Sequence, residues 1–85
     1  MIKEEGNEYI VKLEALGLGK NDIDIEVKNG ELLISSDKYE FGRYNKTIYL
    51  TDDVDLEKIS ANCVNGVLTM RLPKKLGYSR KIRIE

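Results

Sequence analysis

Hydrophobic and polar positions alternate along this chain in short runs, and each run ends at a turn signal. The clearest case is the segment 59–73, where two apolar runs flank Asn65-Gly66. Asn-Gly is the strongest short signal for a two-residue hairpin turn, because both central residues need a positive φ. The run after the turn has one fully apolar face, made of Leu68, Met70 and Leu72. We therefore predict a hairpin that ends at Pro73, whose missing N–H stops the ladder, and expect the other strands to cover its apolar face.

Two earlier segments show the same period of two residues. Residues 8–16 place Tyr9, Val11, Leu13 and Ala15 on one face, with Ile10 among charged residues on the other. Residues 22–28 alternate more strictly, with apolar side chains at Ile23, Ile25 and Val27. A second Asn-Gly pair, Asn29-Gly30, follows and predicts a turn into a return strand over residues 31–35.

The segment 37–57 is less regular. Aromatic and β-branched residues favour strand over 37–50, while Gly42 and Asn45 interrupt it, so one long bent strand and a hairpin turning near Gly42 both fit. The acidic run 51–57 is typical of a single capped turn, with Thr51 or Asp52 accepting backbone N–H groups. A calcium loop is the alternative for this run, although the central Gly and distal Glu of an EF-hand loop are missing.

The C-terminal part is polar and ends on two isoleucines. Residues 74–81 are predicted to be a linker, and Ile82 and Ile84 share one side of an extended segment. No helix of ordinary length is predicted anywhere. Six or seven short strands with turns between them predict an all-β, immunoglobulin-like antiparallel β-sandwich over residues 1–75, followed by a tail over residues 76–85.

The composition limits the chemistry of the chain. Its 85 residues have room for one small domain, and they include one Cys and no His. This excludes a disulfide framework within one chain, an ordinary zinc site and the commonest general base. Cys63 is expected to be a small core residue, and a lone Cys is typical of the reducing cytosol. We expect a cytoplasmic protein with no metal.

Charge and hydropathy narrow the partners further. The formal net charge is −1 with 34% charged residues, and there is no basic stripe of the kind that nucleic acid requires. The first residues lack the apolar run of a signal peptide, and no stretch is long enough for a membrane span. No phosphate-binding glycine loop is present, and no nucleophile–base pair can be built without His, beyond Cys63 or a Ser with Lys. We predict neither a cofactor nor enzymatic activity.

Several motifs resemble the α-crystallin domain of small heat-shock proteins. The most specific is residues 65–74, Asn-Gly-Val-Leu-Thr-Met-Arg-Leu-Pro-Lys, which is similar to the family's Asn-Gly-Val-Leu-Thr signature and its closing Leu-Pro-Lys. Residues 53–55 and 59–61 match the segment before that signature, and residues 20–27 resemble the family's Lys-x-Asp-Ile-x-Ile strand. Ile82-Arg83-Ile84 is similar to the family's terminal Ile-x-Ile. The resemblance covers about residues 9–85.

The resemblance implies an ATP-independent chaperone, a holdase that binds exposed apolar segments of unfolding proteins and self-associates through its tail. In the family the tail docks across an edge groove, which maps here onto the strands 23–27 and 59–63. The groove residues implied by position are Ile23, Ile25, Val27, Ile59 and Ala61, with Ile82 and Ile84 as the tail motif. The alternative is that Ile23, Ile25, Ile59 and Ala61 simply fill the core of the sandwich.

Three departures from the family pattern matter, and the first two support a second hypothesis. Only about eight residues precede the first predicted strand, where the family usually has a long arm. The stretch 35–46 is too short to reach a partner, whereas microbial members exchange a strand from a long insertion here. Leu16-Gly17-Leu18 also replaces Leu-Pro-Gly. The missing arm and the short stretch 35–46 favour the alternative of a CS-domain-like interaction module or co-chaperone, which resembles the same sandwich without the exchanged strand and binds one folded partner.

Overall fold

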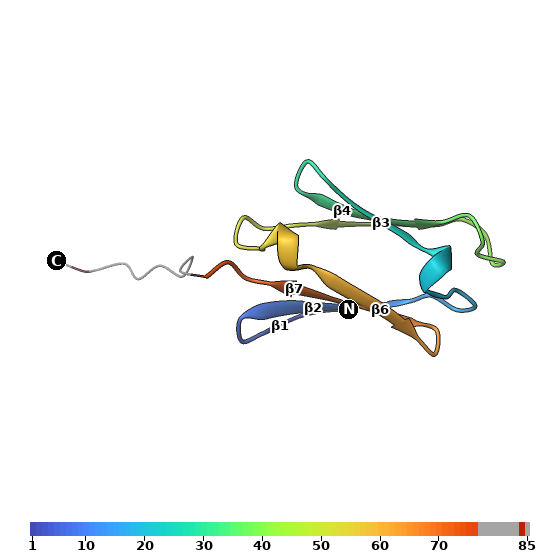
Figure 1. Ribbon diagram of the computed structural model, residues 1–85, viewed down its shortest axis with the longest axis horizontal. Coiled ribbons are helices and arrows are strands. Elements are labelled where there is room, and N and C mark those ends of the chain that lie inside the picture. Colours follow the sequence, from blue (N-terminus) through green and yellow to red (C-terminus); the bar gives the residue numbers. More distant parts are fainter. Residues whose placement is uncertain (77–83, 85) are drawn as a thin grey trace.

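Two antiparallel β-sheets packed face to face form the whole fold, as the computed structural model of the chain shows for residues 1–76 and 84 (Figure 1). The predicted all-β sandwich is confirmed. One sheet has four strands in the order β1-β2-β7-β6, and the other has three in the order β3-β4-β5. The strands are β1 (Ile2–Glu5), β2 (Glu8–Glu14), β3 (Asp24–Lys28), β4 (Glu31–Ser36), β5 (Tyr44–Tyr49), β6 (Ser60–Val64) and β7 (Val67–Pro73).

Both predicted Asn-Gly hairpins are confirmed. Asn29 and Gly30 have φ of 51° and 76°, and Asn65 and Gly66 have φ of 53° and 76°. Two consecutive positive φ values define the type I′ turn, whose twist matches that of the flanking strands. The turns fix the register, so that Lys28 faces Glu31 across β3–β4 and Val64 faces Val67 across β6–β7.

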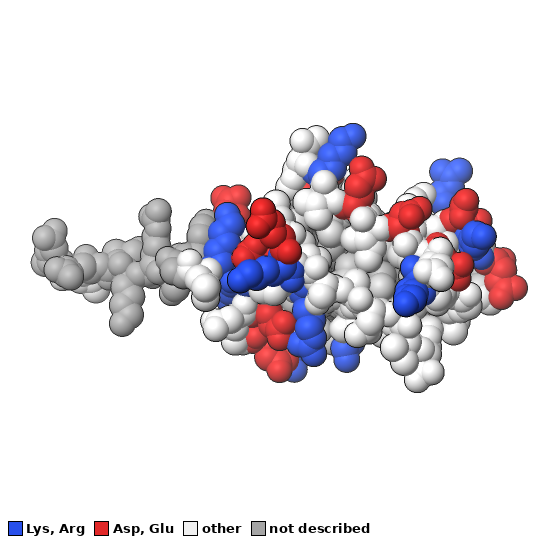
Figure 2. Space-filling view, in the orientation of Figure 1, with Lys and Arg blue, Asp and Glu red and all other residues white. Residues whose placement is uncertain are grey.

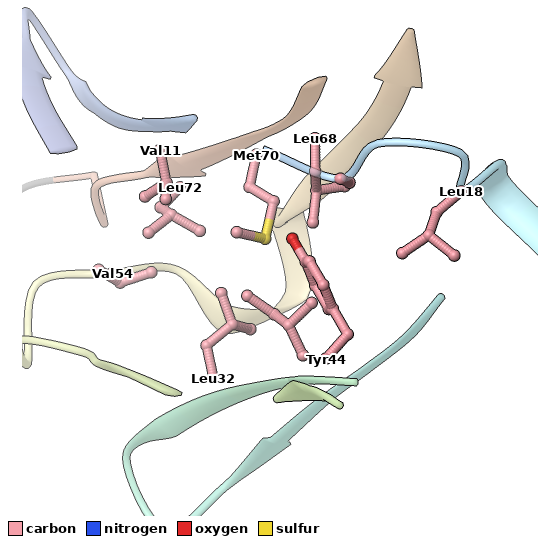
Figure 3. Close-up of a cluster of buried hydrophobic side chains, with 10 residues drawn as sticks. Val11, Leu18, Leu32, Tyr44, Val54, Leu68, Met70 and Leu72 are labelled. Carbon is pink, nitrogen blue, oxygen red and sulfur yellow. The ribbon is translucent and has the colours of Figure 1, made fainter. Parts of the chain in front are cut away.

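The apolar face of β7 lies at the centre of the core, as its alternation predicts. Leu68, Met70 and Leu72 are buried, and Figure 3 shows Met70 between side chains of its own sheet and Leu32 and Tyr44 of the opposite sheet. The Tyr44 hydroxyl donates to the Glu14 carbonyl oxygen at 2.6 Å, which joins the two sheets by a hydrogen bond. The buried cluster consists of Val11, Ala15, Leu18, Leu32, Ile34, Tyr44, Val54, Leu68, Met70 and Leu72.

The sequence did not predict β1, because the first predicted strand began at residue 8. β1 begins at Ile2 and pairs with β2 through a two-residue turn, Gly6-Asn7. Only the first of these two residues has a positive φ, 61° at Gly6, which is the type II′ pattern. The strand was missed because its residues are all exposed and its sequence, Ile-Lys-Glu-Glu, shows no alternation between apolar and polar positions.

In the segment 37–58 the structure decides between two alternatives and corrects one prediction. The chain reverses between β4 and β5 through residues 37–43, so of the two alternatives for residues 37–50 a hairpin turning near Gly42 forms and one long bent strand does not. The acidic run does contain a short 3₁₀ turn, η2 (Leu56–Lys58), but its cap is Asp55, which accepts from the Glu57 N–H at 3.2 Å. Thr51 and Asp52 are not the cap, because the turn starts further along the run than the sequence indicated.

Helical structure in the described part of the chain is confined to η2 and a second 3₁₀ turn, η1 (Lys20–Asp22), each three residues long. None of the helical segments there has the length and apolar character of a membrane span.

Leu32 and Leu33 are neighbours on β4 that face opposite sides, and they provide a matched test of the core. Leu32→Ala removes a side chain with no exposed surface, and we expect it to lower the free energy of unfolding by about 2–5 kcal/mol. Against a total of roughly 4–13 kcal/mol for a domain of this size, this is a large loss. Leu33 is only partly buried, so Leu33→Ala should lower the free energy of unfolding clearly less than Leu32→Ala does. Urea denaturation of both variants measures the difference. Equal losses would show that the faces of β4 are assigned wrongly.

Candidate functional site

An apolar groove lies between the free edges of the two sheets. β3 is the edge strand of the three-stranded sheet, and β6 is an edge strand of the four-stranded sheet. Between them is a partly open groove of about 240 Å³. Figure 2 shows this face: uncharged surface lies between β3 and β6, with acidic side chains over β3 along its upper border. The lining residues are Lys20, Ile23, Ile25, Ala61, Asn62, Cys63 and Leu68.

The five residues predicted for a groove divide into two groups. Ile23, Ile25 and Ala61 line the groove, and Ile25 and Ala61 are exposed, with 38% of the Ile25 surface accessible. Ile23 is half-buried and also packs against the core. Val27 and Ile59 do not line this groove. Val27 is 40% exposed further along β3, and Ile59 is half-buried against the core just before β6.

The free backbone groups at the two edges follow from the hairpin registers. Residues that flank a two-residue turn exchange both of their hydrogen bonds, and the pattern then alternates along each strand. The N–H and C=O groups of Ile25 and Val27 therefore point away from β4, and those of Ala61 and Cys63 point away from β7. Both borders of the groove can thus accept an added strand through main-chain hydrogen bonds.

Cys63 was predicted to be a core residue, but it is less buried than a core residue would be. It is only partly buried, packs against the core and lines the groove, and its Sγ–H donates to the Leu18 carbonyl oxygen at 3.2 Å. Its place in the groove could have been predicted, because alternation along β6 puts Cys63 on the same face as Ala61. Lys20 could not have been found in this way, because η1 brings it to the groove from outside any strand.

The linker predicted from residue 74 starts later in the structure. Lys74 N–H donates to the Asn7 carbonyl oxygen and Lys75 N–H donates to the Asp53 carbonyl oxygen, both at 2.7 Å, and Val54 forms an isolated bridge with Lys74. The sandwich therefore holds the chain as far as Lys75. Of the tail motif, Ile84 is 93% exposed, whereas Ile82 lies outside the described residues.

A polar cluster surrounds this point of exit. The Tyr9 hydroxyl donates to Asp53 Oδ2 at 2.7 Å, the Thr51 hydroxyl also donates to the Asp53 carboxylate, and Lys74 pairs with Glu4. The hydrogen bonds from Thr51 and Tyr9 lower the pKa of Asp53, and the bond to Asp53 raises the pKa of Tyr9. The pKa of Lys74 is raised, chiefly by its hydrogen bond to Glu4. The acidic loop, β1 and the end of β7 are held together by these side chains.

No three His, Cys, Asp or Glu side chains among the described residues are grouped so that they would hold a metal ion. The acidic run 51–57 is used instead for local structure. Asp53 accepts side-chain hydrogen bonds, and Asp55 caps η2.

Comparison with known proteins identifies the family to which the sandwich belongs. The model of the Hsp20/alpha crystallin family matches residues 1–85, and the chain belongs to this family. Small heat shock protein C3 of Rickettsia felis is 33% identical over 81 residues, which cover 82% of this chain and 41% of that protein. The probable 15 kDa heat shock protein of Leptospira interrogans is 28% identical over 94 residues, covering 95% of this chain and 72% of that protein.

Solved structures show the same architecture. A small heat-shock protein from Xylella fastidiosa superposes with a TM-score of 0.81 at 25% identity, over all of this chain and 93% of that one. A mutant of hsp14.1 from Sulfolobus solfatataricus P2 gives a TM-score of 0.80 at 27% identity, over 99% of this chain and 75% of that one. This chain spans less than half the length of the Rickettsia felis relative, so it corresponds to only part of that protein.

The Tyr9–Asp53 hydrogen bond predicts how stability responds to acid. The pKa of Asp53 is lowered in the folded state, so the stabilisation it provides is complete above its ordinary value of 3.8 and is lost as the pH falls below it. Tyr9→Phe removes one of the hydrogen bonds that lower this pKa. The variant should therefore lose less stability than the unchanged protein between pH 5 and pH 2, measured as urea midpoints across that range. Identical pH profiles would show that the bond does not form in solution.

Proposed function

We propose that this chain is an ATP-independent holdase that binds extended apolar segments of unfolding proteins in the groove between β3 and β6. The observation that carries the proposal is that Ile25 and Ala61 are exposed on facing edges whose free main-chain groups can accept a strand. An unfolding protein exposes segments that are both apolar and locally extended, which is what such a groove selects. The membership of the chain in the Hsp20/alpha crystallin family supports the same role.

The size of the groove supports weak and reversible binding. Burying two isoleucine-sized side chains contributes roughly 3–6 kcal/mol before ordering costs are counted. The lost freedom of the bound segment offsets much of this gain. A single groove therefore holds a segment only briefly, and strong retention of a client requires several grooves acting together. Capture and release then need no nucleotide and no catalytic step.

We further propose that the tail, through Ile82 and Ile84, links copies of the chain by occupying the same kind of groove. Ile84 is almost fully exposed, so it does not pack on the sandwich of its own chain. A small heat-shock protein from Xylella fastidiosa that superposes on this chain has a distinct high order structure. Tail and client would then compete for one surface, in the reducing cytosol to which the single cysteine points.

The short reversal over residues 37–43 supports the second candidate, a CS-domain-like module that binds one folded partner. β5 follows β4 directly in the sheet, and the loop between them, closed by contacts among Tyr39, Phe41 and Tyr44, leaves no length for an exchanged strand. A pull-down from the native cell extract separates the candidates. One dominant partner at normal temperature supports the module, and many species captured only after heating support the holdase.

Ala61→Arg should remove most of the holdase activity. A long charged side chain in the groove blocks an apolar segment, while the exposed position of Ala61 leaves the fold intact. Val64→Arg is the matched control, because it puts the same side chain on an exposed position of the other face of β6. The measurement is light scattering from a heat-denaturing client at equimolar or higher chaperone. Equal suppression by both variants would exclude this groove, and no suppression by the unchanged protein would count against a holdase.

The pair of substitutions Ile82→Ser and Ile84→Ser tests the tail. Removing both apolar side chains eliminates the burial that would hold the tail in a groove, so oligomer size or client retention should fall. Light scattering coupled to size exclusion, at two protein concentrations, measures the assembly directly. Unchanged mass and unchanged retention would leave the tail without a role in association.

A further inference from the structure

The outer face of β3, the strand that borders the groove, carries two carboxylates, Asp24 and Glu26, and one cation, Lys28 at its end. On β3, Ile25 pairs across the sheet with the buried Ile34 and so faces inward, while Asp24 and Glu26 alternate with it and face outward. All five residues of β3 are exposed. By contrast, the outward positions on β6, the other border, are the uncharged Ser60, Asn62 and Val64. The two borders of the groove therefore differ in charge.

Within the described part of the chain, Asp24 and Glu26 have no partner of opposite charge. Among residues 1–76, the ion pairs are Lys3–Glu5, Arg71–Glu8 and Lys74–Glu4, and neither Asp24 nor Glu26 belongs to one. Asp22, just before β3, instead accepts a hydrogen bond from the Gly19 N–H. Two cations lie nearby: Lys28 ends β3, and Lys20 lines the groove. Both carboxylates thus remain available to a segment that pairs with the free edge of β3.

A segment added to β3 has its side chains ordered by the same alternation. If two apolar residues spaced by one enter the groove beside Ile25 and either Ile23 or Val27, the residue between them lies on the outer face. In one register that residue is directly across from Asp24, and in the other it is across from Glu26. Directly opposed residues on paired strands have Cβ atoms about 4.5–5.5 Å apart, which is within reach of an ion pair.

We propose that Asp24 and Glu26 make the groove selective for extended segments in which a cationic residue stands between two apolar ones. This inference rests on the proposed function and adds a rule for which segments bind. The chain itself carries such a sequence, Ile82-Arg83-Ile84. In either register Arg83 would lie opposite Asp24 or Glu26. The charge of Arg83 and the spacing of the two isoleucines therefore favour binding of the same segment. Segments with Asp or Glu at the middle position are disfavoured, because like charges would then oppose each other across the strands.

The test uses the full chain with Ile82→Ser and Ile84→Ser, so that its own tail does not compete. The probe is a fluorescent peptide with the sequence of residues 78–85, and its binding is followed by anisotropy at about 0.15 M salt, where exposed charges more than about 8 Å apart are largely screened. Reversing the charge at Arg83 to Glu should weaken binding about three- to ten-fold, as expected for exposed charge pairs. The control peptide carries Arg80→Glu, which changes the net charge equally at a distance from the motif and should bind within about two-fold of the unchanged peptide.

Charge-reversal variants of the protein that binds the peptide give the reciprocal test. Asp24→Lys with Glu26→Lys should invert the preference, so that the Arg83→Glu peptide binds more tightly than the unchanged one. Glu14→Lys, an exposed position on the outer face of the other sheet, should leave the preference as it was. Circular dichroism of each variant confirms that the sandwich is intact. High salt should reduce every one of these charge-dependent differences.

The outcomes separate this inference from the function on which it rests. A peptide with both isoleucines changed to Ser should not bind, and equal binding of that peptide would overturn the groove itself. If the isoleucines are required but Arg83→Glu and Arg80→Glu bind alike, the charge selection is wrong and the groove remains. If the preference stays the same on the Asp24→Lys, Glu26→Lys variant, the selectivity comes from charges other than these two.

Discussion

The contact between the apolar face of β7 and the inner face of the three-stranded sheet determines the rest of this structure. Met70 lies at its centre, with Leu68 and Leu72 on the same strand and Leu32 and Tyr44 opposite. β3 and β6 are edge strands of the two sheets, and the groove lies between them. Neither β3 nor β6 contributes a residue to the buried cluster, which is completed by Tyr44 of β5 and by Leu18 and Val54 from the connections, so the groove between these two edges stays open.

The sequence predicted those parts of the fold that local rules determine. The positive φ values of Asn29 and Asn65 follow from turn chemistry, and the burial of Leu68, Met70 and Leu72 follows from alternation. β1 was missed because its order comes from pairing with β2, which no pattern within Ile2–Glu5 records. The cap at Asp55 was misplaced for a similar reason. The end of β7 pairs with the acidic loop through Asp55 N–H and the Pro73 carbonyl oxygen, and this fixes where the 3₁₀ turn begins.

The groove could be predicted only in part. The family resemblance indicated the two bordering strands, and alternation along them could not decide between groove and core for Ile23, Ile25, Ile59 or Ala61. In the structure Ile25 and Ala61 line the groove. Ile23 lines the groove and also packs against the core, and Ile59 packs against the core. That Lys20 lines the groove could not be predicted, because its position depends on the path of the connection before β3 and not on alternation along a strand.

An exposed apolar edge strand can pair with the same strand of other copies and so cause open-ended aggregation. The arrangement that builds amyloid stacks identical strands in register at 4.7–4.8 Å. Stacked in that way, β3 would set Asp24 above Asp24 and Glu26 above Glu26 at every layer, and the repulsion would grow along the fibril. Charged side chains on an edge strand can thus keep an exposed apolar surface from stacking against copies of itself.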